Sequence, residues 1–193
     1  ACDASIVTDL SDDTQLATLA DRLAGDCPDV LVNVAGVMRF GLHESQPIEA
    51  LALCYRVNLL VPAVLARAVA APMRARGTGQ IVNIGSMSGK VGQPFAASYA
   101  MTKRAIQSLT FSTALAVAKR QITCNCVAPG AVATDFIAAL REKPGWDEAT
   151  AKHTPMGRIG EPDDIAGAVM MLLGDDARWV TGQVIEASGG LAL

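Results

Sequence analysis

The chain is poor in charged and aromatic side chains. Of its 193 residues, only 18% are charged and 4% are aromatic, against 51% that are hydrophobic. A disordered chain has the opposite balance, so this composition excludes disorder. The formal net charge of −3 also lacks the basic excess typical of nucleic-acid-binding proteins, and we predict no nucleic-acid partner. The length suits one domain with a sizeable core, and we treat residues 1–193 as a single domain.

The sequence also lacks an apolar run long enough to span a membrane. Its longest apolar stretch, residues 57–73, contains Asn58, Pro62 and Arg67 and is shorter than the roughly 20 residues that a bilayer requires. No basic segment followed by an apolar run opens the sequence, so we expect no secretory leader. We interpret the stretch as a buried helix and predict no membrane partner.

Paired cysteines are missing as well. The five cysteines, at positions 2, 27, 54, 124 and 126, are an odd number, and none forms a Cys-x-x-Cys pair. This usage predicts reduced thiols in a cytoplasmic protein. Cys124 and Cys126 point to one face of a strand-like run, where they are either metal ligands or buried small side chains. We prefer the second interpretation and predict no metal site.

Short β-type runs alternate with helical patterns along the chain, which is typical of a parallel α/β sheet. The β-type runs are residues 5–8, 29–33, 80–85, 122–127 and 183–186. We predict helices from Ser11 or Asp12 to Gly25, from about Ser45 past Asn58, from about 97 to 119, and from 162 to 173. Gln15 is spaced for a capping box with Asp12, and Pro62 should kink or break the second helix.

Two segments carry further expectations. Residues 59–73 are apolar on every helical face, and because only one side can pack on the sheet, we predict a homo-oligomer, either a dimer or a tetramer; burial under the chain's own loops is the alternative. Residues 134–161 are long and rich in proline and glycine, which predicts a lid or substrate loop. Several side chains in and near this segment either line a substrate pocket or only pack their loop: Phe95, Phe136, Trp146 and Met156. His153 is a further candidate for substrate contact, but for His153 and for His43 we prefer a solvated loop position.

Tyr99 and Lys103 carry the clearest chemical signal. They lie four residues apart in a predicted helix, so their side chains share one face. An ammonium near a phenol stabilises the phenolate and lowers its pKa, which makes Tyr99 a usable general acid or base. With two tyrosines and five lysines in the chain, this spacing has a chance expectation of about 0.05, so the pair needs supporting motifs.

Supporting motifs occur at characteristic positions. They are Asn33-Val34-Ala35-Gly36 after the second β-type run, Asn58 in the next helix, Ser86 thirteen residues before Tyr99, Asn125-Cys126-Val127-Ala128-Pro129-Gly130 after the fourth run, and Thr181-Gly182 before the last. Together with Tyr99 and Lys103 they resemble the short-chain dehydrogenase/reductase family over nearly the whole chain. The combination is specific for the family and says little about the individual member.

The resemblance implies a Rossmann-type, doubly wound parallel sheet flanked by helices, which binds NAD or NADP. A hydride would pass between the nicotinamide and a small-molecule alcohol or ketone. Tyr99 would exchange a proton with the substrate oxygen, and Ser86 would hydrogen-bond that oxygen. Lys103 would hold the ribose hydroxyls, and Asn58 would position a water that links Lys103 to solvent.

The resemblance also assigns cofactor contacts. Asp9 and Leu10 would contact the adenine; Asn33, Ala35 and Gly36 the adenosine half; and Pro129, Gly130, Val132 and Thr134 the nicotinamide end, in addition to Tyr99 and Lys103. Each has a plainer alternative. Asp9 could cap a helix, Asn33 could be a polar strand end, and the glycines and the proline could serve turns.

One part of the family pattern is missing from this sequence. No segment matches the glycine-rich phosphate loop or the second strand, so the motif order begins at the family's third strand. Without those strands, residues 5–8 lack a neighbour and residues 29–33 become an exposed edge. The chain would be part of a longer protein, a true truncation, or one completed by a partner chain, and we expect the first.

The sequence thus predicts an NAD(P)-dependent oxidoreductase, most similar to 3-oxoacyl carrier-protein reductases and related bacterial dehydrogenases. The alternative function is a catalytically silent assembly or binding subunit that lacks the cofactor phosphate site. Neither the substrate nor the choice between NAD and NADP follows from the sequence, because loop shape and residues outside these motifs determine them.

Overall fold

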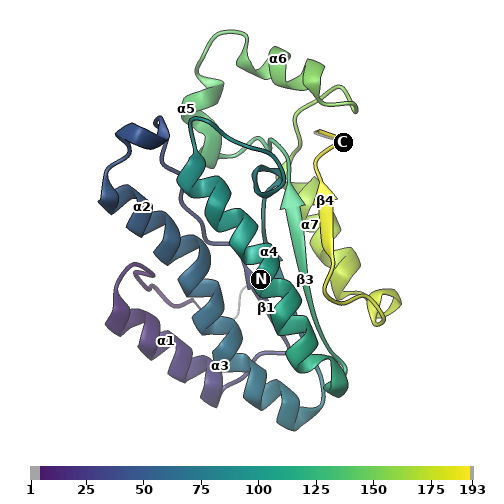
Figure 1. The fold of residues 1–193 in the computed structure, drawn as a ribbon. Coiled ribbons are helices and arrows are strands. Elements are labelled where there is room, and N and C mark those ends of the chain that lie inside the picture. The colour runs from purple at the N-terminus through teal and green to yellow at the C-terminus, as the bar shows by residue number, and fades with distance from the viewer. Residues whose placement is uncertain (1–4, 192–193) are drawn as a thin grey trace.

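The computed structural model describes residues 5–191, in which a parallel sheet is flanked by helices on both faces (Figure 1). Cys2 lies outside the described residues. The four described strands run in the order β1-β2-β3-β4 and are β1 (Val30–Asn33), β2 (Gly79–Ile84), β3 (Ile122–Pro129) and β4 (Val184–Ala187). Every neighbouring pair is parallel. The predicted α/β fold class is confirmed, and the carboxyl ends of the strands share one edge.

The prediction of a strand at residues 5–8 is wrong, because these residues have no regular secondary structure. A strand needs a neighbour for its N–H and C=O groups, and Val7 is instead 98% exposed. Within the described residues β1 pairs only with β2 and forms the expected edge. Residues 5–8 have the composition of a strand, but no neighbouring strand is present in the described structure for them to pair with.

Two layers of helices cover the sheet (Figure 1). Helices α3 (Val61–Arg76) and α4 (Ala97–Val117) pack on one face, and α1 (Asp13–Gly25) packs on α3. Helix α7 (Pro162–Leu173) packs on the other face, against β2, β3 and β4. The larger core lies on the α3 and α4 side, and its fully buried side chains include Val69, Met73, Ile81, Val117 and Ile122. Each such side chain contributes about 1.5–3 kcal/mol by burial.

A single long helical segment runs from α2 (Ile48–Tyr55) through the π-helical turn η2 (Arg56–Leu60) into α3. The helix continues through Pro62, because the proline lies in the first turn of α3, directly after the π turn, so no break occurs there. By length and composition alone, residues 48–76 could cross a membrane, a test that buried core helices also pass. Val61, Leu65 and Val69 of this segment are buried in the core.

The packing of α3 changes the argument for an oligomer. The side of α3 that does not face the sheet packs against α1 and α4 of the same chain, so it is not left free for a partner subunit. The exposed apolar side chains lie elsewhere: Ile48 and Tyr55 on α2, Met101, Phe111 and Leu115 on α4, and Met170 and Met171 on α7. The second side of α3 is thus covered within the chain, by helices and not by the loops that the alternative named.

The helix ends follow the sequence closely. Asp12 caps α1 by accepting a hydrogen bond from the Gln15 N–H at 2.8 Å. Gln15 Oε1 accepts a hydrogen bond from the Asp9 N–H at 2.9 Å and not from the Asp12 N–H, so the predicted capping box is only half formed. Helix α7 begins and ends at the predicted residues, with Glu161 and Asp164 forming a complete capping box.

Residues 134–161, the predicted lid or substrate loop, contain short helices. They contain η5 (Asp135–Ile137), α5 (Ala138–Arg141) and α6 (Trp146–His153). In Figure 1 α5 and α6 lie beyond the carboxyl end of β3, above the edge of the sheet. The remaining short elements are η1 (His43–Ser45), η3 (Met87–Gly89), η4 (Ala118–Arg120) and η6 (Asp175–Ala177).

Candidate active site

A cavity of about 960 Å³ opens at the carboxyl ends of β1, β2 and β3, between the start of α4 and residues 131–153. Ligands of open α/β sheets bind at this edge, where loops and helix ends converge. The predicted site residues that line it are Gly36, Ser86, Tyr99, Lys103, Pro129, Gly130, Val132 and Thr134. Segments far apart in sequence are thus brought to one place by the parallel topology.

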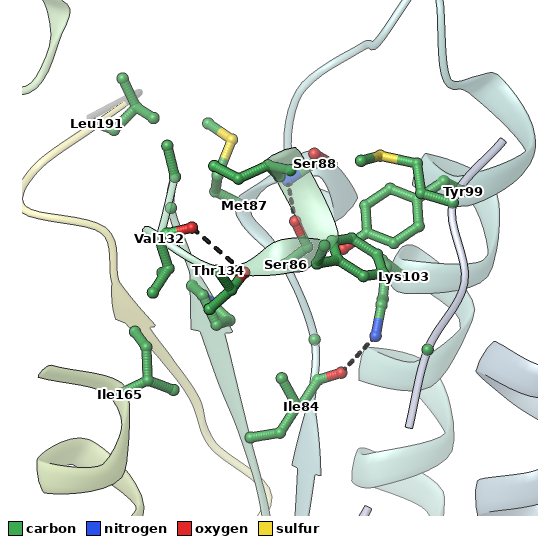
Figure 2. Close-up of a pocket in the computed structure, with 18 of the residues that line it drawn as sticks. Ile84, Ser86, Met87, Ser88, Tyr99, Lys103, Val132, Thr134, Ile165 and Leu191 are labelled. Carbon is green, nitrogen blue, oxygen red and sulfur yellow. Dashed lines mark hydrogen bonds between the residues drawn. The ribbon is translucent and has the colours of Figure 1, made fainter. Parts of the chain in front are cut away.

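Tyr99 and Lys103 lie one turn apart on α4 and face this cavity (Figure 2). Tyr99 is 8% exposed and Lys103 4% exposed. The Lys103 Nζ atom lies 5.7 Å from the centroid of the Tyr99 ring. The prediction that the two side chains share one helical face is confirmed.

The ammonium of Lys103 is held by the end of β2. Its Nζ donates a hydrogen bond to the Ile84 carbonyl at 2.7 Å (Figure 2). Burial lowers the pKa of Lys103 from 10.5 to about 8, because water no longer solvates the charge. Lys103 is therefore a cation at neutral pH, and it loses its charge in mildly alkaline solution.

The pKa of Tyr99 differs from the expectation. We predicted that Lys103 would lower it, yet burial raises the pKa of Tyr99 above 10, and the Ser86 hydroxyl only partly opposes that shift. Desolvation of a nearly buried phenolate outweighs the hydrogen bond from Ser86, and the neighbouring Cys54 raises the pKa further. Tyr99 is thus a neutral phenol at pH 7 and can donate a proton.

Ser86 follows β2 in extended backbone and caps η3, where its Oγ accepts a hydrogen bond from the Ser88 N–H at 3.1 Å. Two glycines permit this arrangement. A Cβ on Gly85 would lie 2.6 Å from Cys126 Sγ, and one on Gly89 would lie 2.8 Å from the Lys103 carbonyl oxygen. Only glycine at these positions lets β2 meet β3 and η3 lie on α4, which places Ser86 beside Tyr99 (Figure 2).

Asn58 acts as a clamp within the protein. Its Oδ1 accepts from the Val37 N–H at 2.7 Å, and its Nδ2 donates to the Val37 carbonyl at 2.9 Å and to Thr102 Oγ1 at 3.0 Å. The Thr102 hydroxyl in turn donates to the Tyr99 carbonyl at 2.8 Å. Sequence reasoning missed Thr102, although its place directly before Lys103 was a usable signal. The π turn thus fixes the loop after β1 to the start of α4.

Other predicted cofactor residues have structural partners and do not line the cavity. Asn33 Nδ2 donates to Asn83 Oδ1 at 2.8 Å, and Asn83 Nδ2 donates to Thr110 Oγ1 at 3.0 Å, which joins β1, β2 and α4. Asp9 accepts hydrogen bonds from the backbone and hydroxyl of Ser11, which lower its pKa. Leu10 packs against the main core. Ala35, like these three, is outside the cavity lining.

Residues of the 134–161 segment form the far wall of the cavity. Phe136, Trp146 and His153 line it, whereas Phe95 and Met156 do not. The Phe136 ring lies against Tyr99, with ring centroids 5.8 Å apart and planes tilted by 48°. His153 Nδ1 is 2.7 Å from the Ala149 carbonyl, so that nitrogen carries a proton and donates it.

The cysteines behave as buried side chains. Cys124 and Cys126 are fully buried, and burial raises their pKa values to about 12 and about 11. Four cysteines within the described part of the chain are free, namely Cys27, Cys54, Cys124 and Cys126. Among residues 5–191 no group of three or more His, Cys, Asp or Glu side chains is arranged to hold a metal ion.

Sequence comparisons add independent findings. A family model described as "Enoyl-(Acyl carrier protein) reductase" matches residues 1–192. Galactitol 2-dehydrogenase (L-tagatose-forming) of Cereibacter sphaeroides is 38% identical over 192 residues, which cover 97% of this chain and 75% of that protein. The 3-oxoacyl-[acyl-carrier-protein] reductase FabG of Haemophilus influenzae is 35% identical over 190 residues, with coverages of 97% and 78%.

Solved structures that resemble this chain are also named as dehydrogenases. A crystal structure from Beutenbergia cavernae, with NADP bound at low occupancy, superposes with a TM-score of 0.94 at 35% identity, over 97% of this chain and 76% of that one. A gluconate 5-dehydrogenase from Burkholderia cenocepacia, in complex with NADP and tartrate, has a TM-score of 0.89 at 33% identity, with coverages of 96% and 73%. The chain thus spans about three quarters of the length of these neighbours.

Proposed function

The chain belongs to the short-chain dehydrogenase/reductase family, and on that premise we propose that it transfers a hydride between NAD or NADP and a secondary alcohol or ketone, with Ser86, Tyr99 and Lys103 as its catalytic residues. One observation carries the proposal. Ser86, Tyr99 and Lys103 are all buried, and they line the same cavity at the carboxyl edge of the sheet. The crystallised neighbours that hold NADP or NADH support the choice of cofactor.

The residues present fit the nicotinamide half of such a cofactor. A Cβ on Gly36 would lie 3.7 Å from Lys103 Nζ and 3.4 Å from Asn58 Oδ1, so the bare glycine keeps space free beside the ammonium. Lys103 would donate to the ribose hydroxyls there, and Pro129, Gly130, Val132 and Thr134 would surround the nicotinamide. The bound nicotinamide supplies or accepts the hydride.

The chain's own residues handle the proton and the developing charge. In the reducing direction the neutral phenol of Tyr99 donates its proton to the carbonyl oxygen as the hydride reaches the carbonyl carbon, which yields the alcohol. The Ser86 hydroxyl donates a hydrogen bond to the same oxygen. Lys103, a cation below about pH 8, stabilises the tyrosinate that remains. Oxidation of the alcohol reverses each step.

Asn58 supports this set as a positioning residue, since its amide holds both Val37 and Thr102. We keep the prediction that a water near Asn58 links Lys103 to solvent. Asp9, Leu10, Asn33 and Ala35 stay predicted contacts of the adenosine half. Residues 134–161 would act as the lid, since α5 and α6 overhang the cavity.

Titration of the native protein with NADH and NADPH, followed by nicotinamide fluorescence, tests the proposal. We expect saturable binding of at least one of the two, followed by ketone-dependent oxidation of the bound coenzyme. Binding of neither would favour the catalytically silent subunit instead. If the coenzyme binds but no ketone-dependent turnover follows, the assignment of Ser86, Tyr99 and Lys103 as catalytic residues would be wrong.

We also propose a homo-oligomer, a dimer or tetramer, built on α4 rather than α3. Met101, Phe111 and Leu115 are exposed apolar side chains on α4, and Leu115 is 82% exposed. Sedimentation of the native protein should give a mass of two or four chains, and Leu115→Glu should lower it. A monomer at micromolar concentration would contradict this proposal.

The proposed location is the cytoplasm. The free, buried thiols of Cys54, Cys124 and Cys126 suit a reducing compartment. Cell fractionation with an antibody against the native protein would test this. Recovery in the membrane fraction would contradict it and would return attention to the helix at residues 48–76.

A further inference from the structure

We infer that the alcohol or ketone accepted by this site has an apolar, uncharged body and is not a polyol, a sugar or an aldonate. The inference rests on the proposed function and adds the substrate class to it. The relatives fall into two groups: one sequence relative is named for galactitol and three solved structures for gluconate, whereas other relatives are named for acyl substrates. The inference places this chain with the second group.

The lining of the cavity that holds Ser86 and Tyr99 is mainly aliphatic and aromatic. The loop after β1, residues 131–153, helix α7 and Leu191 contribute to it. Its large side chains include Met38, Phe40, Phe136, Leu140, Trp146 and Leu191. An apolar substrate body that replaces water here gains the free energy of burying both surfaces.

Charge on the wall excludes acidic substrates. Among the described residues that line the cavity, Lys103 is the single lysine or arginine. Its Nζ already donates to the Ile84 carbonyl, and the cofactor ribose would take its remaining capacity. A carboxylate or phosphate on the substrate body would therefore be desolvated without a cationic partner, which is costly.

The supply of hydrogen bonds excludes polyols. Beyond the proposed catalytic side chains and Thr134, the polar side chains on the lining are Ser88, Gln93, Thr150 and His153. His153 Nδ1 already hydrogen-bonds the Ala149 carbonyl. These groups, together with the Trp146 indole N–H, are too few to satisfy every hydroxyl of a hexitol, which would bury the others without partners.

Phe136 places the apolar preference next to the reacting carbon. Its ring centroid is 5.8 Å from that of Tyr99, the proposed proton donor. A substituent on the carbonyl carbon that points toward residues 134–153 would therefore lie close to this ring. An alkyl group fits that contact, and a hydroxymethyl group loses hydration there.

Matched alcohols test the inference by turnover. 2-Hexanol and galactitol both have six carbons and a hydroxyl at C2, and gluconate adds a carboxylate to a similar skeleton. With the native protein and NAD or NADP in the oxidised form, kcat/KM for 2-hexanol should exceed that for the other two by at least about tenfold. A higher kcat/KM for galactitol or gluconate would overturn the inference and leave the proposed function standing.

Tryptophan fluorescence tests the same point without turnover. Trp146 lines the cavity, whereas Trp179 is 96% exposed and lies outside the lining. In a Trp179→Phe variant, 2-hexanone should change the emission of Trp146, and galactitol at equal concentration should not. The matched Trp146→Phe variant should show no response to either. A larger response to galactitol would overturn the inference even if no coenzyme bound, so its failure is distinguishable from that of the proposed function.

A pair of phenylalanine variants locates the preference. Phe136→Ser should raise KM for 2-hexanol by about tenfold while leaving coenzyme binding unchanged, because it removes the ring beside Tyr99. Phe95→Ser is the matched control, since Phe95 is exposed and outside the lining. Equal effects of the two changes would contradict a specific contact at Phe136.

Discussion

The two walls of the cavity differ in how firmly the protein holds them. On one side, β3 is buried at every residue except Pro129, and α4 has nine buried residues, Tyr99 and Lys103 included. On the other side, η5, α5 and α6 contain no buried residue in the structure as described. The proposed catalytic residues are thus held by a rigid wall, formed by β3 and α4, and substrate selection would depend on a loosely packed wall, formed by η5, α5 and α6. This division lets specificity change without disturbing catalysis.

The largest predicted effect belongs to the rigid wall. Tyr99→Phe removes the phenol proton and should lower kcat by about 10²–10⁴-fold, with coenzyme affinity and melting temperature nearly unchanged. Steady-state kinetics, coenzyme titration and thermal unfolding measure the three quantities. Tyr55→Phe is the matched control, because Tyr55 is exposed and lies outside the cavity. A Tyr99→Phe enzyme with near-normal kcat would remove Tyr99 from the mechanism.

Lys103→Met should separate activity from stability. The pKa of Lys103 is lowered from 10.5 to about 8, so below pH 8 the folded protein carries a buried charge that the unfolded chain solvates freely. Removing this buried charge should raise the free energy of unfolding by about 3 kcal/mol, the equivalent of the pKa shift. Losing the hydrogen bond to Ile84 should lower it by about 1 kcal/mol, so the variant should be more stable by about 2 kcal/mol. Its kcat should fall by about 10²-fold or more.

The pH dependence gives the sign of this effect. Between about pH 8 and 10.5 the unfolded chain binds one more proton than the folded protein, so wild-type stability rises with pH across that window. The advantage of Lys103→Met is therefore largest below pH 8, and above about pH 10.5 only the cost of the lost bond to Ile84 remains. Urea unfolding at several pH values measures it. A variant less stable than wild type at pH 7 would mean that Lys103 stabilises the fold.

Thr102→Val tests how far rigidity itself supports catalysis. The Thr102 hydroxyl joins Asn58 to the Tyr99 carbonyl, and valine keeps its volume without these bonds. We expect kcat to fall about tenfold at nearly constant KM, because a small displacement of Tyr99 weakens proton transfer more than binding. Thr102→Ser should restore most of kcat. If serine fails to do so while the melting temperature is normal, the hydroxyl does not position Tyr99.

The sheet, α7 and the face of α4 that carries Tyr99 and Lys103 were more predictable from sequence than the helices of residues 134–161. The bounds of α7, four of the five strands and the shared face of Tyr99 and Lys103 all follow from local patterns of apolar residues and caps. The strand at residues 5–8 failed because pairing depends on a neighbour, which a local pattern does not contain. The raised pKa of Tyr99 and the bond from Asn33 to Asn83 depend on burial and on strands that only the fold brings together. Helices α5 and α6 were not predicted, because the prolines and glycines of residues 134–161 favour a loop.

The smallest predicted effect belongs to the loose wall. Arg158 and Asp164 form a two-bond ion pair, at 2.6 and 2.8 Å, that ties the end of the lid to the first turn of α7. Together with the Glu161 N–H, the Arg158 guanidinium holds the pKa of Asp164 well below its ordinary value. Because the pair is exposed and solvent screens it, Arg158→Ala should leave the melting temperature nearly unchanged.

The kinetic consequence of Arg158→Ala decides whether the two walls act separately. A lid that closes less readily should raise KM for the substrate a few-fold and leave kcat unchanged, as steady-state kinetics would show. Arg141→Ala is the control, since its partner Asp147 lies within the lid and not on α7. A fall in kcat as large as that of Thr102→Val would mean that the lid also positions Tyr99, through the contact of its ring with Phe136. Substrate selection could then not change independently of the chemistry.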